Sequence, residues 1–164
     1  MTVYFAHTEK ETIEFGRWLG DSASRFISAG TVIFLKGDLG SGKTTLCRGV
    51  LRHFGYYGAV KSPTYTIVEP YEIEFGQINH FDFFRIKHPY ELDFIGIDDY
   101  FLPDMLCLVE WPEKGIGAVP KVDLSVSIET DGANRKISLT PDSEIGERIF
   151  FRMQEIGYDA FLPQ

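Results

Sequence analysis

The sequence predicts an α/β fold in which a mixed central β-sheet is flanked by helices. Strand-like runs alternate with segments of helical periodicity along the 164 residues. Some of the runs are apolar throughout, as in strands buried on both faces, and others alternate between apolar and polar residues, as in strands with one exposed face. No linker, internal repeat or low-complexity tract interrupts the chain, so we expect residues 1–164 to form a single domain.

The first predicted element is a helix that follows a capping box. Thr8 and Glu11 have the spacing at which a hydroxyl and a carboxylate cap the first turn of a helix. Apolar residues then recur at helical intervals from Phe15 to Ile27, and Gly30 ends the pattern. We therefore expect a helix that begins after Thr8 and continues until Gly30.

The next segments predict a buried strand, a helix and a hairpin. TVIFL (31–35) is β-branched and apolar, which indicates a strand buried on both faces, and TTLCRGVLRHF (44–54) has its apolar residues on one side of a helix. The segments 64–72 and 77–84 read as extended and flank a turn, so we expect them to pair as a hairpin. Pro70 places the first of them at a sheet edge or a bulge.

The second half of the chain predicts three more strands and two helices. Residues 89–96 form a short helix with proline in its first turn, and 105–111 form another buried strand. Residues 122–130 and 134–141 alternate as half-buried strands around the DGAN turn. A last helix covers about 143–156.

Composition and charge narrow the class of function. Sixteen basic and 24 acidic residues give a formal net charge of -8, which disfavours autonomous binding to a nucleic acid backbone. The N-terminal residues lack the pattern of a secretory signal, and no apolar run is long enough to span a membrane, so we expect a cytoplasmic protein. Cys47 and Cys107 lie singly in apolar surroundings and are expected to be reduced packing residues.

A glycine-rich loop between the strand 31–35 and the following helix carries the strongest signal. GDLGSGKT (37–44) satisfies the G-x-x-x-x-G-K-[ST] pattern, in which backbone amides and a helix N-terminus hold phosphate groups. Lys43 is expected to bridge the outer phosphates, and the Thr44 hydroxyl is expected to bind Mg²⁺. The fold class is therefore refined to a single P-loop NTPase domain.

Two carboxylates are candidates to complete such a site. Glu110 follows the apolar run MLCLV, and Asp82 follows INHF, so each acid stands where a buried strand should reach the surface. A metal-bound triphosphate needs carboxylates at the ends of neighbouring strands, which hold the ion or orient an attacking water. Together with Lys43, these two acids form the predicted catalytic set.

The nucleotide is predicted to be ATP. No N-K-x-D sequence, which reads guanine in GTPases, occurs in the chain. A small-molecule kinase is the alternative function, but such an enzyme usually needs several arginines on a lid, and the middle of the chain offers only Arg85.

Four segments, taken in order, carry a family resemblance. GDLGSGKTTL, KSPTYTIVEPY, HFDFFR and VEWPEK, in a chain of this length, resemble the TsaE (YjeE) family of small bacterial ATPases over roughly residues 8 to 140. The resemblance implies a role in forming N6-threonylcarbamoyladenosine (t6A) in tRNA, as an ATP-hydrolysing accessory of the TsaB–TsaD pair, with tRNA involved only indirectly. Hydrolysis by the isolated protein is expected to be slow.

The resemblance also assigns roles to particular residues. Thr44 and Glu110 would hold Mg²⁺, and Thr8 and Arg135 would approach the nucleotide from the first helix and the late hairpin. The residues implied to hold the phosphates form the loop itself: Gly37, Asp38, Leu39, Gly40, Ser41, Gly42, Lys43, Thr44 and Thr45.

The segment SPTYT (62–66) would be a switch that senses the γ-phosphate through the hydroxyls of Ser62, Thr64 and Thr66; an ordinary polar loop is the other interpretation. Asp82 would then be a second switch acid that polarises water or holds the metal through water. The family's usual H-x-D-L-Y-R has a tyrosine where this chain has Phe84, so a hydroxyl is lost. A nucleotide-binding scaffold that no longer hydrolyses ATP is therefore a third possible function.

Two further residues have open interpretations. His80 could orient Asp82 or be a satisfied structural histidine. Trp111 could exclude water from the site or form a partner surface, and simple core packing is the alternative.

Overall fold

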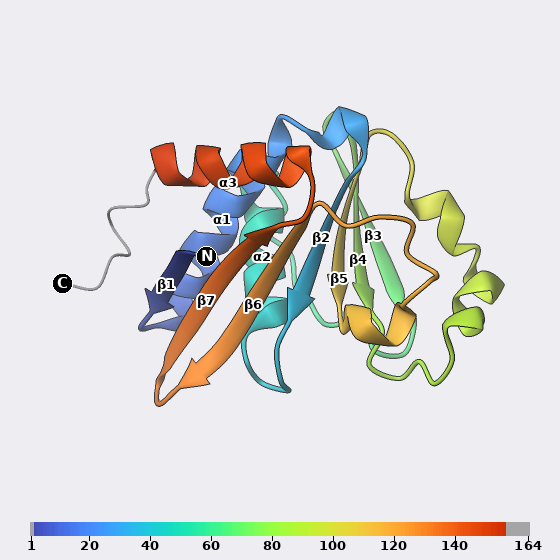
Figure 1. Cartoon of the computed structure of the whole chain (residues 1–164), viewed down its shortest axis with the longest axis horizontal. Coiled ribbons are helices and arrows are strands. Elements are labelled where there is room, and N and C mark those ends of the chain that lie inside the picture. The colour runs from blue at the N-terminus through green and yellow to red at the C-terminus, as the bar shows by residue number, and fades with distance from the viewer. Residues whose placement is uncertain (1, 157–164) are drawn as a thin grey trace.

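The computed structural model describes residues 2–156, and in this part of the chain seven strands form one sheet. The order across the sheet is β1-β7-β6-β2-β5-β4-β3. In Figure 1, β1 and β7 lie toward one end of the molecule and β3 and β4 toward the other. The strands are β1 (Thr2–Ala6), β2 (Thr31–Lys36), β3 (Val68–Ile73), β4 (Gly76–Asp82), β5 (Met105–Glu110), β6 (Leu124–Asp131) and β7 (Asn134–Pro141).

The sheet is mixed, as the sequence predicts. Central β2 lies between β5 and β6 and is parallel to both, and β4 is parallel to β5. The outer pairs β1·β7, β6·β7 and β3·β4 are antiparallel. The predicted hairpin is thus confirmed, and Pro70 lies on the edge strand β3, where its missing N–H does not interrupt the sheet.

Three α-helices pack on one face of this sheet: α1 (Glu9–Ser24), α2 (Lys43–His53) and α3 (Glu144–Ile156). Their apolar side chains join those of the strands in the larger core, which includes Phe15, Leu46 and Ile149. On the opposite face, a smaller apolar cluster covers β2, β4 and β5 with residues from two 3-10 helices, η2 (Pro89–Ile95) and η3 (Ile97–Tyr100). Two further 3-10 turns are η1 (Ile27–Ala29) and η4 (Pro112–Gly115).

The expected elements are present, with differences at their ends and one additional strand. The first helix starts after Thr8 but ends at Ser24 rather than Gly30, because η1 and a left-handed Gly30 (φ 74°) turn the chain into β2. The short helix expected over 89–96 is present as the 3-10 helix η2, and the strand expected from residue 64 starts only at Val68. Strand β1 is an addition, since the TVYFA run received no assignment from the sequence.

Close contact between α1 and α2 depends on two glycines. A Cβ built on Gly49 would lie 2.2 Å from the Ile13 carbonyl oxygen and 2.9 Å from the Gly16 Cα. The two helix backbones therefore approach more closely than any side chain would allow, which fixes α2, and the loop before it, against α1.

Cys47 and Cys107 are free and buried, which confirms their assignment as packing residues. Among the described residues, none of the helices has both the length and the apolar character needed to cross a membrane.

Candidate functional site

The loop from 37 to 42 connects β2 to α2 at the carboxyl end of the central strand. Gly42 caps α2 in a left-handed conformation (φ 111°), and Gly40 is also left-handed (φ 75°). Both conformations favour glycine, which explains the glycines of the motif. Because the cap residue has no side chain, it leaves the first amides of the 11-residue helix α2 uncapped, as an anion-binding helix end requires.

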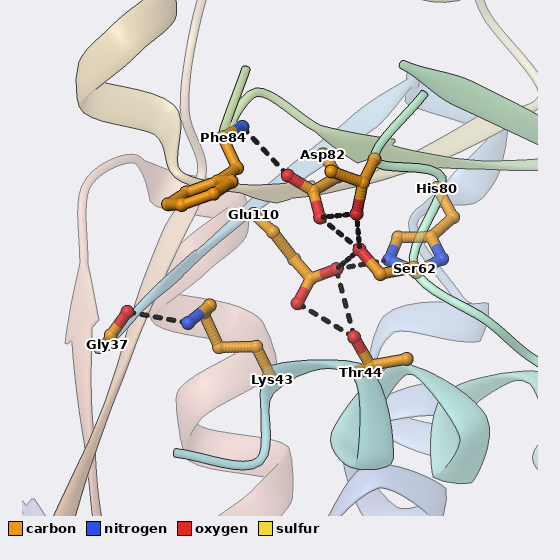
Figure 2. A network of polar contacts seen from close by, with 9 residues as sticks. Gly37, Lys43, Thr44, Ser62, His80, Asp82, Phe84 and Glu110 are labelled. Carbon is orange, nitrogen blue, oxygen red and sulfur yellow. Dashed lines mark hydrogen bonds and ion pairs between the residues drawn. The ribbon is translucent and has the colours of Figure 1, made fainter. Parts of the chain in front are cut away.

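Lys43, the first residue of α2, is directed back across this loop. Its Nζ donates to the carbonyl oxygens of Gly37 at 2.6 Å and Asp38 at 2.8 Å, and it lies 4.5 Å from the centre of the Trp111 ring. Burial lowers the pKa of Lys43, and the nearby carboxylate of Glu110 opposes that effect. The ammonium group is thus held at the loop, and Figure 2 shows it directed toward the Gly37 carbonyl.

The two predicted carboxylates, Asp82 and Glu110, are register partners on the parallel strands β4 and β5. Both are nearly fully buried, with 5% and 2% of their surface exposed. Asp82 accepts from the Phe84 amide at 2.8 Å and from the Ser62 hydroxyl. Glu110 contacts the Thr44 hydroxyl at 3.1 Å through one oxygen and at 3.2 Å through the other. The strand ends therefore bring both acids to the start of α2 (Figure 2).

Ser62 connects the two carboxylates. Its hydroxyl donates to Asp82 Oδ2 and also lies 3.2 Å from Glu110 Oε2, while the Thr64 hydroxyl is 3.4 Å from Asp82 Oδ2. The SPTYT segment is thus attached to the carboxylates through Ser62 and Thr64. Thr66 differs from the other two hydroxyl residues: it is exposed and lines neither of the two cavities described below.

A tight turn holds this segment beside β4. The Ile67 amide donates to the Pro63 carbonyl at 2.7 Å, and the Asp82 amide donates to the Ile67 carbonyl at 2.9 Å. Ile67 has a left-handed backbone (φ 71°), which is unfavourable for a β-branched residue. Such strain is found where the surrounding structure imposes it, often at functional sites.

These groups line one cavity of about 270 Å³ at the carboxyl ends of β2, β4 and β5. Inside it, the Ser41 hydroxyl is buried and has no hydrogen-bond partner among the described residues, so a polar group remains for a ligand to satisfy. The lining consists of Leu39, Gly40, Ser41, Gly42, Lys43, Thr44, Thr45, Ser62, Thr64, Asp82, Phe84, Glu110 and Trp111.

A second cavity of about 160 Å³ adjoins the loop on the side of α1 and β7. Thr8 and Arg135, far apart in the sequence, both line it, and Arg135 donates to the Gly40 carbonyl at 3.4 Å. Thr12 also lines it and was not singled out from the sequence. The sequence signal for Thr12 was its position as a polar residue on the buried side of the first helix, one turn after the cap residue Thr8.

The other predicted site residues lie at the start of the loop, at the cavity wall and behind Glu110. Gly37 and Asp38 face the loop side that adjoins β6, apart from the carbonyl contacts with Lys43. Trp111 directly follows β5 in a left-handed conformation (φ 57°) and is half-buried at the cavity wall. The centres of its ring and of the Phe84 ring are 5.1 Å apart. His80 contacts Glu110 at 2.8 Å, whereas orienting Asp82 was one of the two interpretations that the sequence left open.

The side-chain oxygens near the start of α2 are suitable ligands for a small, hard metal cation. The Thr44 hydroxyl contacts Glu110, and Asp82 lines the same cavity. The oxygens of these three side chains are of the type that Mg²⁺ prefers. No cluster of three or more His, Cys, Asp and Glu ligands occurs within residues 2–156.

Comparison with known proteins places this arrangement in a family. Residues 6–137 match the family described as "Threonylcarbamoyl adenosine biosynthesis protein TsaE". The chain belongs to the TsaE family. A relative from Haemophilus influenzae, named "tRNA threonylcarbamoyladenosine biosynthesis protein TsaE", is 49% identical over 118 residues, which cover 72% of this chain and 75% of the relative. A Bacillus subtilis protein of the same name is 33% identical over 133 residues, covering 80% and 81%.

The fold agrees with this membership in the TsaE family. A solved structure titled "Crystal structure of Bacillus subtilus YdiB" superposes with a TM-score of 0.77 at 25% identity, and the match covers 94% of each chain. The P-loop NTPase fold with a mixed sheet, predicted from the glycine loop and the strand pattern, is thereby confirmed.

Proposed function

We propose that this single domain binds and hydrolyses ATP with Mg²⁺. The observation that carries the proposal is that Lys43 and Thr44, at the start of α2, share one cavity with Asp82 and Glu110 from two neighbouring strands. This combination supplies amides and an ammonium group for phosphates and oxygen ligands for a metal ion, the parts that phosphoryl transfer requires.

The two adjoining cavities suggest how the nucleotide is held. The phosphates occupy the larger cavity, where Lys43 neutralises their charge and the buried Ser41 hydroxyl gains a partner. The smaller cavity, with Thr8 and Arg135 on its walls, takes the nucleoside. Gly40 and Gly42 line both cavities, so a ligand in contact with the loop can extend from one to the other.

Thr44 and Glu110 would hold Mg²⁺, which neutralises negative charge that develops on the phosphate oxygens. Asp82 would orient the attacking water or hold the metal through water, and it is itself fixed by the Phe84 amide and Ser62. Ser62 and Thr64 would act as the switch, because their hydroxyls contact the carboxylates that face the phosphates. Trp111 and Phe84 would exclude water from one side.

In the cell, this protein would act in the biosynthesis of t6A in tRNA, as an accessory of TsaB and TsaD in the cytoplasm. The names of the relatives support the pathway. The net charge of -8 supports contact with tRNA through partners rather than directly.

A reconstitution tests the proposal. Purified TsaB, TsaD and tRNA are incubated with this protein, ATP and an activated threonylcarbamoyl donor, and t6A formed per TsaD is measured together with released phosphate. We expect several turnovers with the wild type and at most one with Lys43→Ala, because the substitution removes the phosphate-binding ammonium group. Lys61→Ala, which alters an exposed lysine outside both cavities, is the matched control.

Other outcomes would reject parts of the proposal. If the modification turned over equally well without this protein or with Lys43→Ala, its role in t6A biosynthesis would be wrong. If radiolabel from the γ-phosphate appeared in a product other than free phosphate, the kinase function would replace hydrolysis. Retention of uncleaved ATP in the presence of the partners and Mg²⁺ would instead indicate a scaffold.

A further inference from the structure

The imidazole of His80 lies behind Glu110, away from the opening of the larger cavity, whose lining does not include it. It is fully buried on β4, two residues before Asp82, and its Nε2 lies 2.8 Å from Glu110 Oε2. Its register partner on β5 is Leu108, two residues before Glu110. Figure 2 shows the imidazole approaching the carboxylate from the side opposite Lys43.

The direction of this hydrogen bond follows from the chemistry of the two groups. An ionised carboxylate only accepts hydrogen bonds, so Nε2 must carry the proton. The other ring nitrogen, Nδ1, is buried and has no partner among the described residues. The contact with Glu110 is therefore the polar interaction that compensates for burying the ring, and an aliphatic residue would cost less if packing were the only requirement.

The neighbours of His80 support this interpretation. Residues on the same face of β4 and β5, such as Ile78, Leu106 and Leu108, are aliphatic and belong to the main core. His80 interrupts this apolar surface, and the next residue on the same face of β4, Asp82, lines the cavity. Within residues 2–156, the hydrogen bond of the His80 ring goes to the carboxylate that also contacts Thr44.

We propose that His80 is a positioning residue that holds Glu110 in the orientation in which its carboxylate meets the Thr44 hydroxyl. Through Glu110, His80 sets how strongly Mg²⁺ promotes nucleotide binding, in the way that outer ligands orient inner ones at metal sites. This inference rests on the proposed function and deepens it. It assigns to His80 a role toward Glu110 and none toward Asp82.

Two amide substitutions separate positioning from packing. In His80→Gln the side-chain nitrogen falls near the place of Nε2 and can still donate to Glu110. In His80→Asn the amide falls near the place of Nδ1 and cannot reach the carboxylate. The matched control is His53→Asn, a half-buried histidine at the end of α2 that is 3.9 Å from Asp21 and outside both cavities.

The measurement is calorimetric titration with a non-hydrolysable ATP analogue at Mg²⁺ concentrations from micromolar to millimolar, and in EDTA. We expect His80→Asn to raise the Mg²⁺ concentration for half-maximal enhancement by about 10–100-fold, the usual effect of removing an outer partner. The affinity of His80→Asn for the analogue in EDTA stays that of the wild type. For His80→Gln and His53→Asn, the Mg²⁺ concentration for half-maximal enhancement stays within about threefold of the wild-type value. A general loss of packing would weaken binding in EDTA as well.

The outcomes distinguish this inference from the function on which it rests. If the wild type binds the analogue but His80→Asn keeps the wild-type Mg²⁺ dependence, the positioning role is wrong and the proposed function stands. If the wild type binds no nucleotide at any Mg²⁺ concentration, both are wrong. Should thermal denaturation show that His80→Asn does not fold, His80→Leu, which matches its aliphatic neighbours, replaces it, with the same expected shift and the same contradicting result.

Discussion

The contact between α1 and α2 allows a quantitative prediction of stability for Gly49→Ala. The new Cβ would lie 2.2 Å from the Ile13 carbonyl oxygen, while ordinary contacts begin at 3.4 Å, so the helices must separate by about 1 Å. The atoms it meets belong to the backbone of α1 and cannot rotate away as a side chain could. Overpacking of this kind costs about 3 kcal/mol at the upper end of its usual range.

An opposing effect reduces this cost. Alanine is the better helix former, by about 1 kcal/mol relative to glycine. The expected net loss is therefore about 2 kcal/mol in the free energy of unfolding, which corresponds to a fall of about 4–8 °C in Tm for a chain of this size. Urea denaturation followed by circular dichroism measures the free energy, and an unchanged m value shows that the unfolding transition remains comparable.

A control variant identifies the contact as the cause. Lys10→Ala changes an exposed residue of α1 and should stay within about 0.5 kcal/mol of wild type. If Gly49→Ala were as stable as wild type, or more stable, the helix backbones would not be in contact as described, and the reasoning would be refuted.

Three further predictions concern single side chains. Phe75 is 87% exposed in a left-handed conformation (φ 66°), so Phe75→Asn should stabilise the protein to urea by about 0.5–1 kcal/mol; a loss of stability would contradict this. Burial raises the pKa of the Cys107 thiol from 9.0 to about 12, so the thiol ionises first in the unfolded state. The contribution of this thiol to the free energy of unfolding is complete below pH 9 and is lost toward pH 12, with a slope of up to about 1.4 kcal/mol per pH unit. Urea denaturation at pH 8 to 10 should therefore show a smaller decline of the free energy of unfolding with pH for Cys107→Ala than for the wild type. Phe84→Tyr should change partner-stimulated phosphate release by less than about threefold, because the Phe84 amide and Ser62 already hold Asp82, and a large increase would show that the missing hydroxyl matters.

The parts of the site that depend on local sequence could be predicted. The glycine loop, the strand before it and the helix after it follow from adjacent residues, because turn geometry, helix capping and apolar periodicity act over a few positions. The carboxylates Asp82 and Glu110 were also found, since an acid directly after an apolar strand has to reach a polar environment. The joint position of Thr8 and Arg135 came from the family resemblance, and the second cavity agrees with it.

Features that depend on long-range pairing could not be predicted. The pairing of β1 with β7 joins residues 2–6 to residues 135–139, and no local pattern specifies it. The contact of His80 with Glu110 instead of Asp82 follows from the parallel register of β4 and β5. The 3-10 conformation of Pro89–Ile95 could not be predicted either, because the apolar periodicity of seven residues is too short to distinguish a 3-10 helix from an α-helix.

The strand sequence HFDFF shows how one short segment serves both faces of the sheet. Successive side chains of a strand point to opposite faces, so His80 and Asp82 share the face covered by the α-helices, while Phe81 and Phe83 enter the apolar cluster on the other face. A shift of one residue in the pairing of β4 with β5 would bury the polar pair in that cluster and direct the phenylalanines at the loop. The same two phenylalanines that stabilise the smaller core thus fix the register, and the register places both polar side chains next to Glu110. Core packing and site geometry are therefore set by one alternating pattern, and a polar substitution at Phe81 would disturb both.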